Sequence, residues 1–344
     1  MVNTRFLRNT WYAAGWAADI GQEPVARTII DEPVLLYRTE QGEVVALSNI
    51  CPHRFAALNL GKLVHDQIEC AYHGLRFDSR GVCVHNPHGP IIPDKARLRK
   101  FPVLQCDGLV WVWMGPDDEA DERKITRFPE LNRPDHFTYT RGITMEMPLS
   151  YELITDNLMD LSHTAFIHAD TLGSECLVPG ETATRHDGEA IWSDRVGING
   201  TPPRAFWETG ACRRDERIDY WIDIRWTPPA TFFIYGGVTP TGTPRENGSE
   251  LSSVQILTPA SEGVTYYFIK HLRDYERDNV EMTKVMEQVI RNAFANEDEP
   301  MIASVTDNMM GREFWSMRPV ILPCDNAAVR VRRKREQMIR EENF

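Results

Sequence analysis

Two short segments of the chain each pair one cysteine with one histidine. "CPHR" supplies Cys51 and His53, "CAYHG" supplies Cys70 and His73, and 16 residues lie between the two pairs. Zinc and iron are the metals that this set of sulfur and nitrogen donors suits. A structural zinc site usually takes two cysteines from one loop and a second like pair from the other. The unlike pairs therefore predict a metal centre that differs from a structural zinc site in how the cysteines and histidines are distributed over the metal ions.

Crossed pairs let two cysteines bind one iron and two histidines bind the other, which is the ligand set of a Rieske [2Fe-2S] cluster. Neutral imidazoles in place of two thiolates leave the cluster less negative and raise its reduction potential, so that a flavin or a ferredoxin can reduce it. The proline between Cys51 and His53 and the glycine after His73 match the same pattern. A structural zinc site is the alternative, and the residues favour the iron–sulfur cluster.

A cluster that carries single electrons predicts a second centre that uses them, and "DNLMDLSHTAFIH" supplies candidate ligands. On a helix, Asp156 and Asp160 are neighbours at i,i+4, and like charges at that spacing need a positive group between them. We expect a metal or a charged imidazole to supply it. His163 and His168 lie about 140° apart on a regular helix, so the helix must be distorted or end before His168 if both bind one ion. Two core or surface histidines are the alternative.

Two histidines and one carboxylate on one face of Fe(II) leave three positions for dioxygen and water, as in non-haem iron oxygenases. The carboxylate candidates lie in "FANEDEP" at the end of a later helix: Glu297, Asp298 and Glu299. Helical periodicity turns the apolar face toward Glu297 more than toward Asp298, so the residues alone do not choose Asp298. A solvated acidic helix end is the alternative for all three.

The elements that must position these groups change in character along the chain. Residues 1 to about 115 alternate short apolar runs with turn sequences, which predicts antiparallel sheet. A polar, acidic stretch follows, and we place a domain boundary near residues 116–135. The rest predicts an α+β domain, with helices over 150–170 and 275–296 and strands around 190–197, 218–226, 230–238, 251–258 and 264–271.

Composition narrows the class of protein. The chain has 344 residues, of which 42% are apolar, and its net charge of −12 argues against a nucleic-acid partner. The basic run "RVRRKR" at 330–335 predicts an exposed helix with a solvated face, and a docking patch for an acidic partner is the alternative. Seven cysteines without a small secreted scaffold indicate reduced thiols and metal ligands rather than disulfides. No apolar run approaches the roughly 18 residues of a membrane span, and no signal-peptide core is present, so we expect a cytoplasmic protein without a membrane partner.

The mixed pairs followed by D-x2-H-x4-H resemble the Rieske non-haem iron oxygenases over essentially the whole chain. The resemblance is closest to the aromatic O-demethylase branch, the vanillate O-demethylase and dicamba monooxygenase oxygenase components. It rests on "NTWYAAGW", "ICPHRFAAL", "CAYHGLRFD", "DNLMDLSHTAFIHA", "PPRAFW", "RWTPPATFFI" and "AAVRVRR". It implies an N-terminal antiparallel β Rieske [2Fe-2S] domain in residues 1–118, followed by an α+β helix-grip catalytic domain in residues 119–344.

The resemblance also implies two sets of metal ligands. The [2Fe-2S] cluster would be held by Cys51, His53, Cys70 and His73, and a mononuclear Fe(II) by His163, His168 and Asp298. Asp298 follows because the carboxylate of the family falls on the Asp of an acidic "ED" pair. This assignment conflicts with the periodicity that favours Glu297, and at this point the conflict stays open.

The resemblance further implies how electrons and substrate are handled. Asp160 would be a bridge, hydrogen-bonded to His163 and to the cluster histidine His73 across a subunit interface in a ring of three chains, with Asn157 in the same polar network. An NADH-dependent reductase with a flavin and an iron–sulfur centre would supply electrons. With dioxygen, the enzyme would then O-demethylate a methoxylated, vanillate-like aromatic acid and release formaldehyde.

The substrate pocket is expected to draw on "TFFIYGGV" and "VMEQVIRNAF", as in the family. Where dicamba-type enzymes place polar contacts, this chain has Ile234 and Val289, which argues against dicamba itself as the substrate. Arg204 and Gln255 could pair with a substrate carboxylate, although such residues are more often ordinary surface or strand residues. The alternatives are hydroxylation of a ring, methyl or N-methyl group at the same iron, and a non-enzymatic Rieske electron carrier with a ligand-binding domain.

Overall fold

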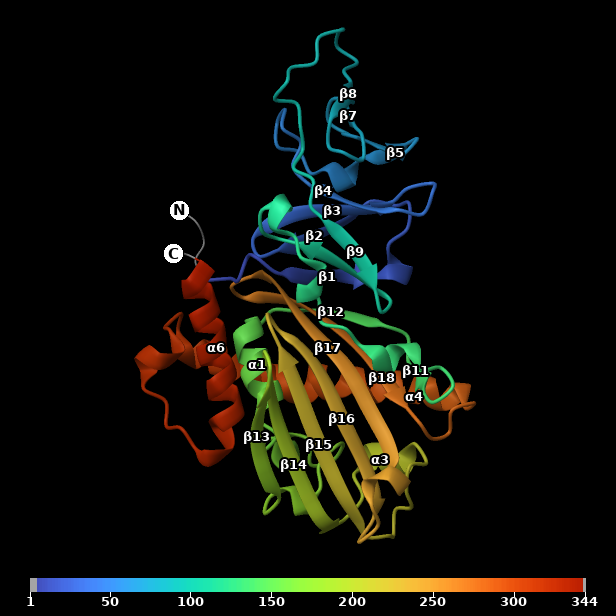
Figure 1. Cartoon of the computed structure of the whole chain (residues 1–344), viewed down its shortest axis with the longest axis vertical. Coiled ribbons are helices and arrows are strands. Elements are labelled where there is room, and N and C mark those ends of the chain that lie inside the picture. The colour runs from blue at the N-terminus through green and yellow to red at the C-terminus, as the bar shows by residue number, and fades with distance from the viewer. Residues whose placement is uncertain (1–4, 343–344) are drawn as a thin grey trace. The chain divides into compact units, whose positions relative to one another are not determined.

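The computed structural model describes residues 5–342, which form two compact units (Figure 1). The first unit contains the residues up to Arg127 together with the distant segment Thr258–Tyr266. The second contains Phe128–Leu257 and Tyr267–Glu341. The division into domains after residue 118 stays a prediction.

Three small antiparallel sheets make up the first unit, as the alternating pattern of its sequence predicts. Their strand orders are β1-β10-β9, β2-β3-β4 and β5-β6-β7-β8. Apolar side chains on β3, β4, β6 and β7 pack into one core that also contains Cys51 and Cys70. The strands are β1 (Trp11–Trp16), β2 (Val25–Ile29), β3 (Glu32–Arg38), β4 (Val44–Ser48), β5 (Lys62–Val64), β6 (Gln67–Glu69), β7 (Arg76–Phe77), β8 (Cys83–His85), β9 (Val103–Cys106) and β10 (Leu109–Trp113).

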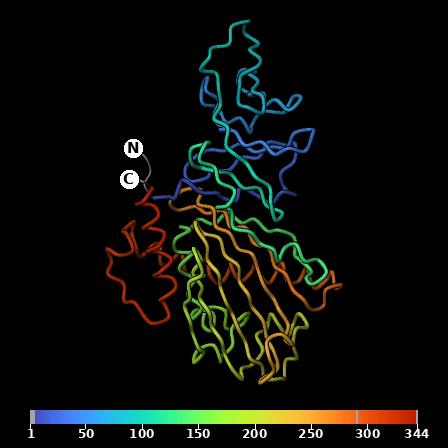
Figure 2. Tube along the Cα trace, viewed as in Figure 1, coloured from blue at the N-terminus to red at the C-terminus, as the bar shows by residue number. Residues whose placement is uncertain are grey.

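One large antiparallel sheet dominates the second unit, and Figure 2 shows its long strands side by side. The strand order is β11-β18-β17-β16-β15-β14-β13, and β12 pairs with β18. The five strands predicted in this region are confirmed as β14 to β18. The strands are β11 (Thr138–Tyr139), β12 (Ile143–Met147), β13 (Glu181–Asp187), β14 (Ala190–Gly200), β15 (Ile218–Thr227), β16 (Thr231–Pro240), β17 (Ser249–Ser261) and β18 (Val264–Arg273).

Helices cover one face of this sheet and leave a cavity between them and the strands. Because side chains alternate along a strand, Tyr220, Ile222 and Ile224 of β15 all point to the cavity side. Residues of α4 and of the π-helix η8 line the opposite wall. The helices are α1 (Tyr151–Met159), α2 (Thr164–Ile167), α3 (Arg204–Glu208), α4 (Val280–Asn292), η8 (Ala293–Asp298), α5 (Glu299–Met309) and α6 (Asn326–Glu342).

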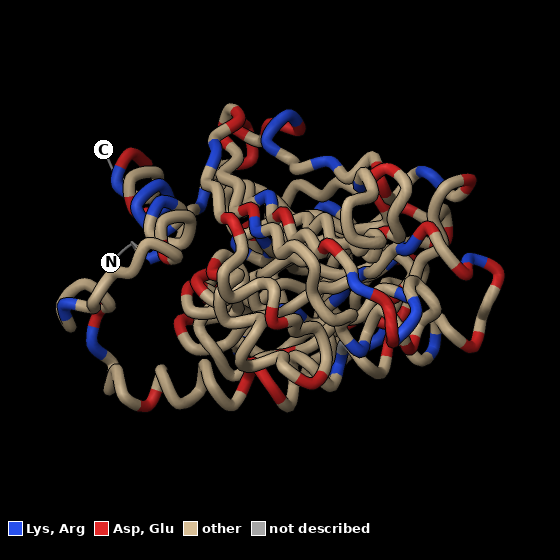
Figure 3. The backbone as a smooth tube through the Cα atoms, turned by 90° about the horizontal axis from the view of Figure 1, so that it is seen from below, with Lys and Arg blue, Asp and Glu red and all other residues tan. Residues whose placement is uncertain are grey.

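The basic run near the C-terminus forms part of α6, and the prediction that its face is solvated is wrong for two residues. Arg332 and Arg335 are both buried. Arg332 pairs with Glu152 and Asp156 of α1, and Arg335 pairs with Glu152. Figure 3 shows basic and acidic residues mixed along α6, near the C-terminal mark. The run therefore ties α6 to α1.

Within the described part of the chain, no helix combines the length and the apolar character that crossing a membrane requires.

Candidate functional site

Two loops of the first unit have the same backbone geometry and present the four mixed ligands. The N–H of Cys51 donates to the carbonyl of Ala56 (2.9 Å), and the N–H of Cys70 donates to that of Leu75 (2.8 Å). In each loop the fourth residue after the cysteine, Phe55 or Gly74, has a positive φ (60° and 72°) and returns a hydrogen bond to the cysteine carbonyl. The "CPHR" and "CAYHG" motifs thus form two copies of one ligand loop.

Each loop places its cysteine in the core and its histidine nearer the surface. Cys51 and Cys70 are buried in the core, while His53 is exposed and its ring lies 4.4 Å from that of His73. Burial raises the pKa of Cys51 to about 11, so a positively charged metal is needed to keep this thiolate inside the core. Two buried sulfurs beneath two outer imidazoles fit a cluster that takes sulfur at one iron and nitrogen at the other. His88 Nε2 lies 3.0 Å from the carbonyl oxygen of His73.

A second cluster lies in the other unit, where the structure brings His163, His168 and Asp298 together. Asp298 Oδ1 lies 3.3 Å from His168 Nε2 and 3.7 Å from His163 Nε2. Ligand atoms that share one ion through bonds of about 2.1 Å lie about 3 to 4 Å apart. The three atoms therefore have the spacing of ligands around a single metal ion.

The outer nitrogen of each ring is already occupied, which leaves Nε2 as the metal-facing atom. His163 Nδ1 bonds the backbone carbonyl of Asp160. His168 Nδ1 lies 2.6 Å from Glu297 Oε2, which also accepts a hydrogen bond of 2.8 Å from the Thr171 hydroxyl. Acceptors at Nδ1 fix the tautomer in which Nε2 carries a free lone pair. Glu297 thus acts behind His168, and Asp298 faces the ligand cluster.

The buried carboxylate of Asp298 lacks a permanently charged partner: among the described side chains, no Lys or Arg pairs with it. The residue is 3% exposed, and its contacts are Asn157 Nδ2, which donates over 3.1 Å, and the two histidines. Burial lowers the pKa of His163; burial would also lower that of His168, but Asp298 and Glu297 outweigh it and raise the pKa. A buried carboxylate is costly without a cation, so a divalent metal fits this site.

The local fold explains why sequence spacing was only a partial guide to this site. The helix predicted over 150–170 is broken: α1 ends at Met159, and α2 ends at Ile167, just before His168. The later helix changes from α to π geometry over η8, and a π-turn contains more residues than an α-turn. This change of phase turns Asp298 inward, where regular α-periodicity favours Glu297. Nothing in the sequence pattern announces the π-helix.

Asp160 and Asp156 differ from the expected arrangement. The Asp160 carboxylate was expected to bond His163, but Asp160 Oδ1 accepts from the Ser162 N–H (2.9 Å) and hydroxyl (2.6 Å), and only its carbonyl meets His163. The charge of Asp156, expected to need a metal or an imidazole, is balanced by Arg332 of α6. Burial raises the pKa of Asp156, and Arg332 opposes that shift.

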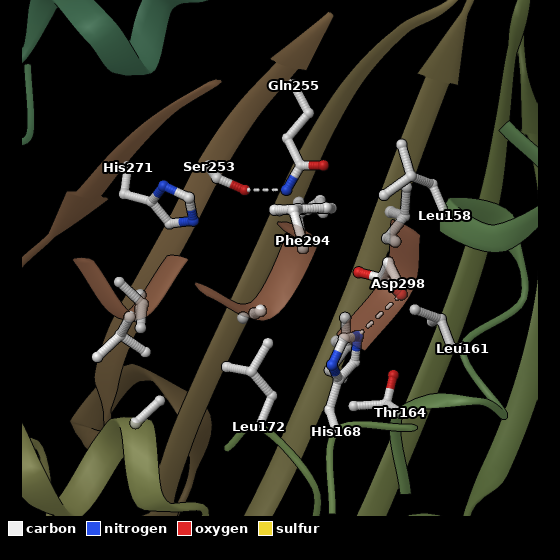
Figure 4. A pocket seen from close by; sticks show the side chains of 18 of the residues that line it. Leu158, Leu161, Thr164, His168, Leu172, Ser253, Gln255, His271, Phe294 and Asp298 are labelled. Atoms are coloured by element: carbon white, nitrogen blue, oxygen red, sulfur yellow. Dashed lines mark hydrogen bonds and ion pairs between the residues drawn. The ribbon is translucent and has the colours of Figure 1, made fainter. Parts of the chain in front are cut away.

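The His163–His168–Asp298 group opens onto a mainly apolar cavity of about 140 Å³ (Figure 4). An apolar cavity of about 150 Å³ is large enough to hold a benzene ring. Ile234 and Gly236 of "TFFIYGGV", and Met286, Val289 and Phe294 of "VMEQVIRNAF", line it, which confirms the two segments predicted. Gln255 also lines it, whereas Arg204 is exposed and pairs with Glu208 at 2.7 Å.

Comparisons with known proteins agree with this arrangement. Residues 10–102 match the model of the Rieske [2Fe-2S] domain, and residues 147–341 match that of the vanillate O-demethylase oxygenase C-terminal domain. The chain is 35% identical to the oxygenase component of chloroacetanilide N-alkylformylase from Rhizorhabdus wittichii (strain DC-6 / KACC 16600), covering 98% of this chain and 97% of that protein. It is 35% identical to the oxygenase component of dicamba O-demethylase from Stenotrophomonas maltophilia, covering 97% and 98%. A crystal structure of dicamba monooxygenase bound to 3,6-dichlorosalicylic acid has a TM-score of 0.92 at 34% identity, covering 98% of this chain and 99% of that one.

Proposed function

Because the chain belongs to the Rieske non-haem iron oxygenases with a C-terminal domain of the vanillate O-demethylase type, we propose that it O-demethylates a methoxylated aromatic compound. The family, the fold class, the enzyme class and the two cofactors predicted from the motifs, a [2Fe-2S] cluster and a mononuclear iron, are confirmed. A vanillate-like acid is the substrate that the motifs predicted.

One observation supports this proposal most: the His163–His168–Asp298 cluster opens into an apolar cavity that fits one aromatic ring. In the proposal, these three residues hold the iron, and Cys51, His53, Cys70 and His73 hold the [2Fe-2S] cluster. Bound at these sites, the iron and the cluster supply the redox chemistry that activates dioxygen.

The chain's own residues bind and orient. Glu297 keeps His168 in one tautomer, Asn157 holds Asp298, and apolar residues such as Leu158 and Phe206 keep water away from the ring. The overall reaction converts one methyl C–H to C–OH, and the second oxygen atom leaves as water with two electrons and two protons. The hydroxylated product is a hemiacetal. The bond between its former methyl carbon and the ring-bound oxygen breaks, the hydroxyl proton passes to that oxygen, and a phenol and formaldehyde are released. NADH supplies the electrons through a flavin and iron–sulfur reductase.

A surface hollow beside the iron ligands supports the proposed ring of three chains. Asp160 and His163 line it together with exposed apolar residues, among them Val320 (85% exposed) and Met301 (51%). Apolar groups gathered at an exposed hollow favour a covering partner. We assign that place to a second copy of this chain, whose His73 would approach Asp160. The cytoplasmic location stays a prediction.

The test is a panel of methoxylated aromatics incubated with the purified protein, a suitable reductase, NADH and dioxygen. We expect equal amounts of formaldehyde and the matching phenol from at least one compound, together with about three irons per chain. An electron carrier without oxygenase activity would hold two irons per chain. Iron analysis of three per chain without formaldehyde from any methoxy compound would contradict O-demethylation.

A further inference from the structure

The cavity next to the iron ligands has a mainly apolar lining, and a strip of neutral polar side chains lies on one of its walls. The strip consists of Ser253 and Gln255 on β17 and His271 on the adjacent strand β18. In Figure 4 these three side chains lie on one side of the pocket, and His168 and Asp298 lie on the other. A planar substrate with its reactive group toward the metal ligands can therefore extend its far end to the strip.

His271 is a member of the strip whose side chain has unused hydrogen-bonding capacity. Its backbone is occupied, because its N–H donates to the Thr140 hydroxyl (2.9 Å) and its carbonyl accepts from the Thr140 N–H (3.0 Å). The side chain is buried, and its Nδ1 has no hydrogen-bond partner within residues 5–342. Buried polar atoms are nearly always paired, so an unpaired nitrogen on a side chain that lines the cavity indicates that the ring can adjust to bind a ligand or a displaceable water.

Ser253 and Gln255 complete a neutral strip. The Gln255 carbonyl oxygen accepts from the Tyr267 hydroxyl, and its amide donates to Ser253 Oγ over 3.0 Å. These bonds fix the orientation of the amide and leave the serine hydrogen free to turn toward a ligand. Burial lowers the pKa of His271 to about 3, so this ring is also uncharged near neutral pH.

Charge is the feature that this strip lacks. Among the lining residues that the structure describes, none is Lys or Arg, and the carboxylate present, Asp298, belongs to the iron site. A substrate carboxylate would lose its water and gain no cationic partner here, whereas an amide or a carbonyl group would gain a hydrogen bond at lower cost.

We infer that the site takes aromatic substrates whose ring carries an uncharged hydrogen-bonding group, such as an amide or a carbonyl, and that His271 is the residue that selects them. This inference rests on the proposed O-demethylation and narrows its substrate class. It departs from the vanillate-like acid, because the wall of the cavity has nothing to balance that acid's charge.

The experiment measures equilibrium binding to the anaerobic holoenzyme at pH 7.5 by calorimetry. The probes are the three isomers of methoxybenzamide, the matching methoxybenzoates, and methoxybenzene, which has no hydrogen-bonding substituent on the ring beyond its ether. We expect at least one benzamide to bind at least about tenfold more tightly than its benzoate. In His271→Phe, that benzamide should lose about tenfold in affinity, while methoxybenzene changes by less than about twofold.

His271→Gln keeps a neutral hydrogen-bonding group and should retain most of the benzamide affinity. Benzoates that bind as tightly as their benzamides in every isomer would overturn the inference, as would equal losses for benzamide and methoxybenzene in His271→Phe. The wild-type comparison decides alone if the variants fail to fold. Formaldehyde is measured on the same probes with reductase. If no probe yields formaldehyde but benzamides still bind more tightly than benzoates, O-demethylation is wrong and the inference about the substrate group stands. If benzoates are demethylated in preference to benzamides, O-demethylation stands and the inference is wrong.

Discussion

At the residue scale, His168 shows how the site divides its two acidic neighbours. Glu297 accepts at Nδ1 over 2.6 Å, and Asp298 stands 3.3 Å from Nε2. Two adjacent carboxylates thus contact opposite edges of one ring. The outer one sets the tautomer and the basicity of the ring, and in the proposed iron site the inner one shares the metal with it.

Replacing Glu297 by Gln should therefore weaken iron binding without removing a ligand. We expect the Fe(II) dissociation constant of the iron-free protein to rise about 10- to 100-fold, because a neutral amide polarises the His168 ring less than a carboxylate does. Titration with Fe(II) measures the effect, and the visible absorption of the cluster should not change. Glu299→Gln removes the same charge two residues further along the chain and is the control. Equal losses in both variants would contradict the role of Glu297.

His271 predicts a pH dependence of stability. Burial lowers its pKa to about 3, compared with about 6.5 in an unfolded chain. Between these values the unfolded state binds more protons, so stability falls as the pH drops below about 6.5. From pH 7 to pH 5 the loss is about 2 kcal/mol, and His271→Phe should not show it. Urea unfolding of both proteins at the two pH values measures the difference; an identical pH dependence would rule out the buried neutral ring.

At the element scale, the π-helix η8 joins α4 to α5 and decides which acidic side chain faces the metal. Deleting the exposed residue Ala295 should restore α-helical spacing and turn Asp298 by about 100° relative to α4. We expect the mononuclear iron to be lost while the cluster remains, as measured by metal analysis and visible absorption. Ala295→Ser keeps the length of the chain and should bind iron normally. A deletion variant with full iron content would show that the extra residue has no such role.

The connection of α6 to α1 predicts a large effect for one arginine. Arg332→Met removes the buried partner of Asp156, while Glu152 keeps Arg335, and it should cost about 3 kcal/mol of unfolding free energy. Adding Asp156→Leu should recover part of the loss, because the unpaired charge is then gone. Arg340→Met changes an exposed residue of the same helix and is the control. Denaturant unfolding measures all three; similar losses at both arginines would contradict the buried pair.

The sequence predicts the elements that are set by local patterns of apolar residues, and it misses those that depend on contacts between distant parts of the chain. Strands β14 to β18 follow from their short apolar segments between turn sequences; β14 largely alternates buried and more exposed residues, whereas β17 buries nine residues in a row. β13 is missing from the prediction because its residues are polar and mostly exposed. The spacing of His163 and His168 indicates a broken helix, and the structure contains one. The π-helix, the pairing of Asp156 with Arg332 and the unpaired His271 depend on non-local packing, which no single-sequence pattern records.

At the scale of the whole molecule, the hollow beside Asp160 predicts assembly. Val320→Glu places a charge on the exposed apolar rim and should not alter the fold of one chain, but it should weaken the proposed ring of three. Sedimentation should show a smaller species with both metals bound and with slow reoxidation of the reduced cluster by substrate and dioxygen. Ile198→Glu, on an exposed position of β14 outside the hollow, is the control. Unchanged sedimentation of Val320→Glu would remove this surface as the interface.

The segment Thr258–Tyr266 completes the first unit from far along the chain. The Thr258 hydroxyl donates to the Ala13 carbonyl over 2.7 Å, and the N–H of Ile30 donates to the Pro259 carbonyl over 2.8 Å. During synthesis on the ribosome, these bonds cannot form until the chain is translated well past residue 258. At about 5–20 residues per second, that leaves the nascent first unit unfinished for roughly 10 to 30 seconds after its own last N-terminal strand has emerged. The four residues of the mixed pairs, all before residue 74, are thus translated long before the segment that completes their unit.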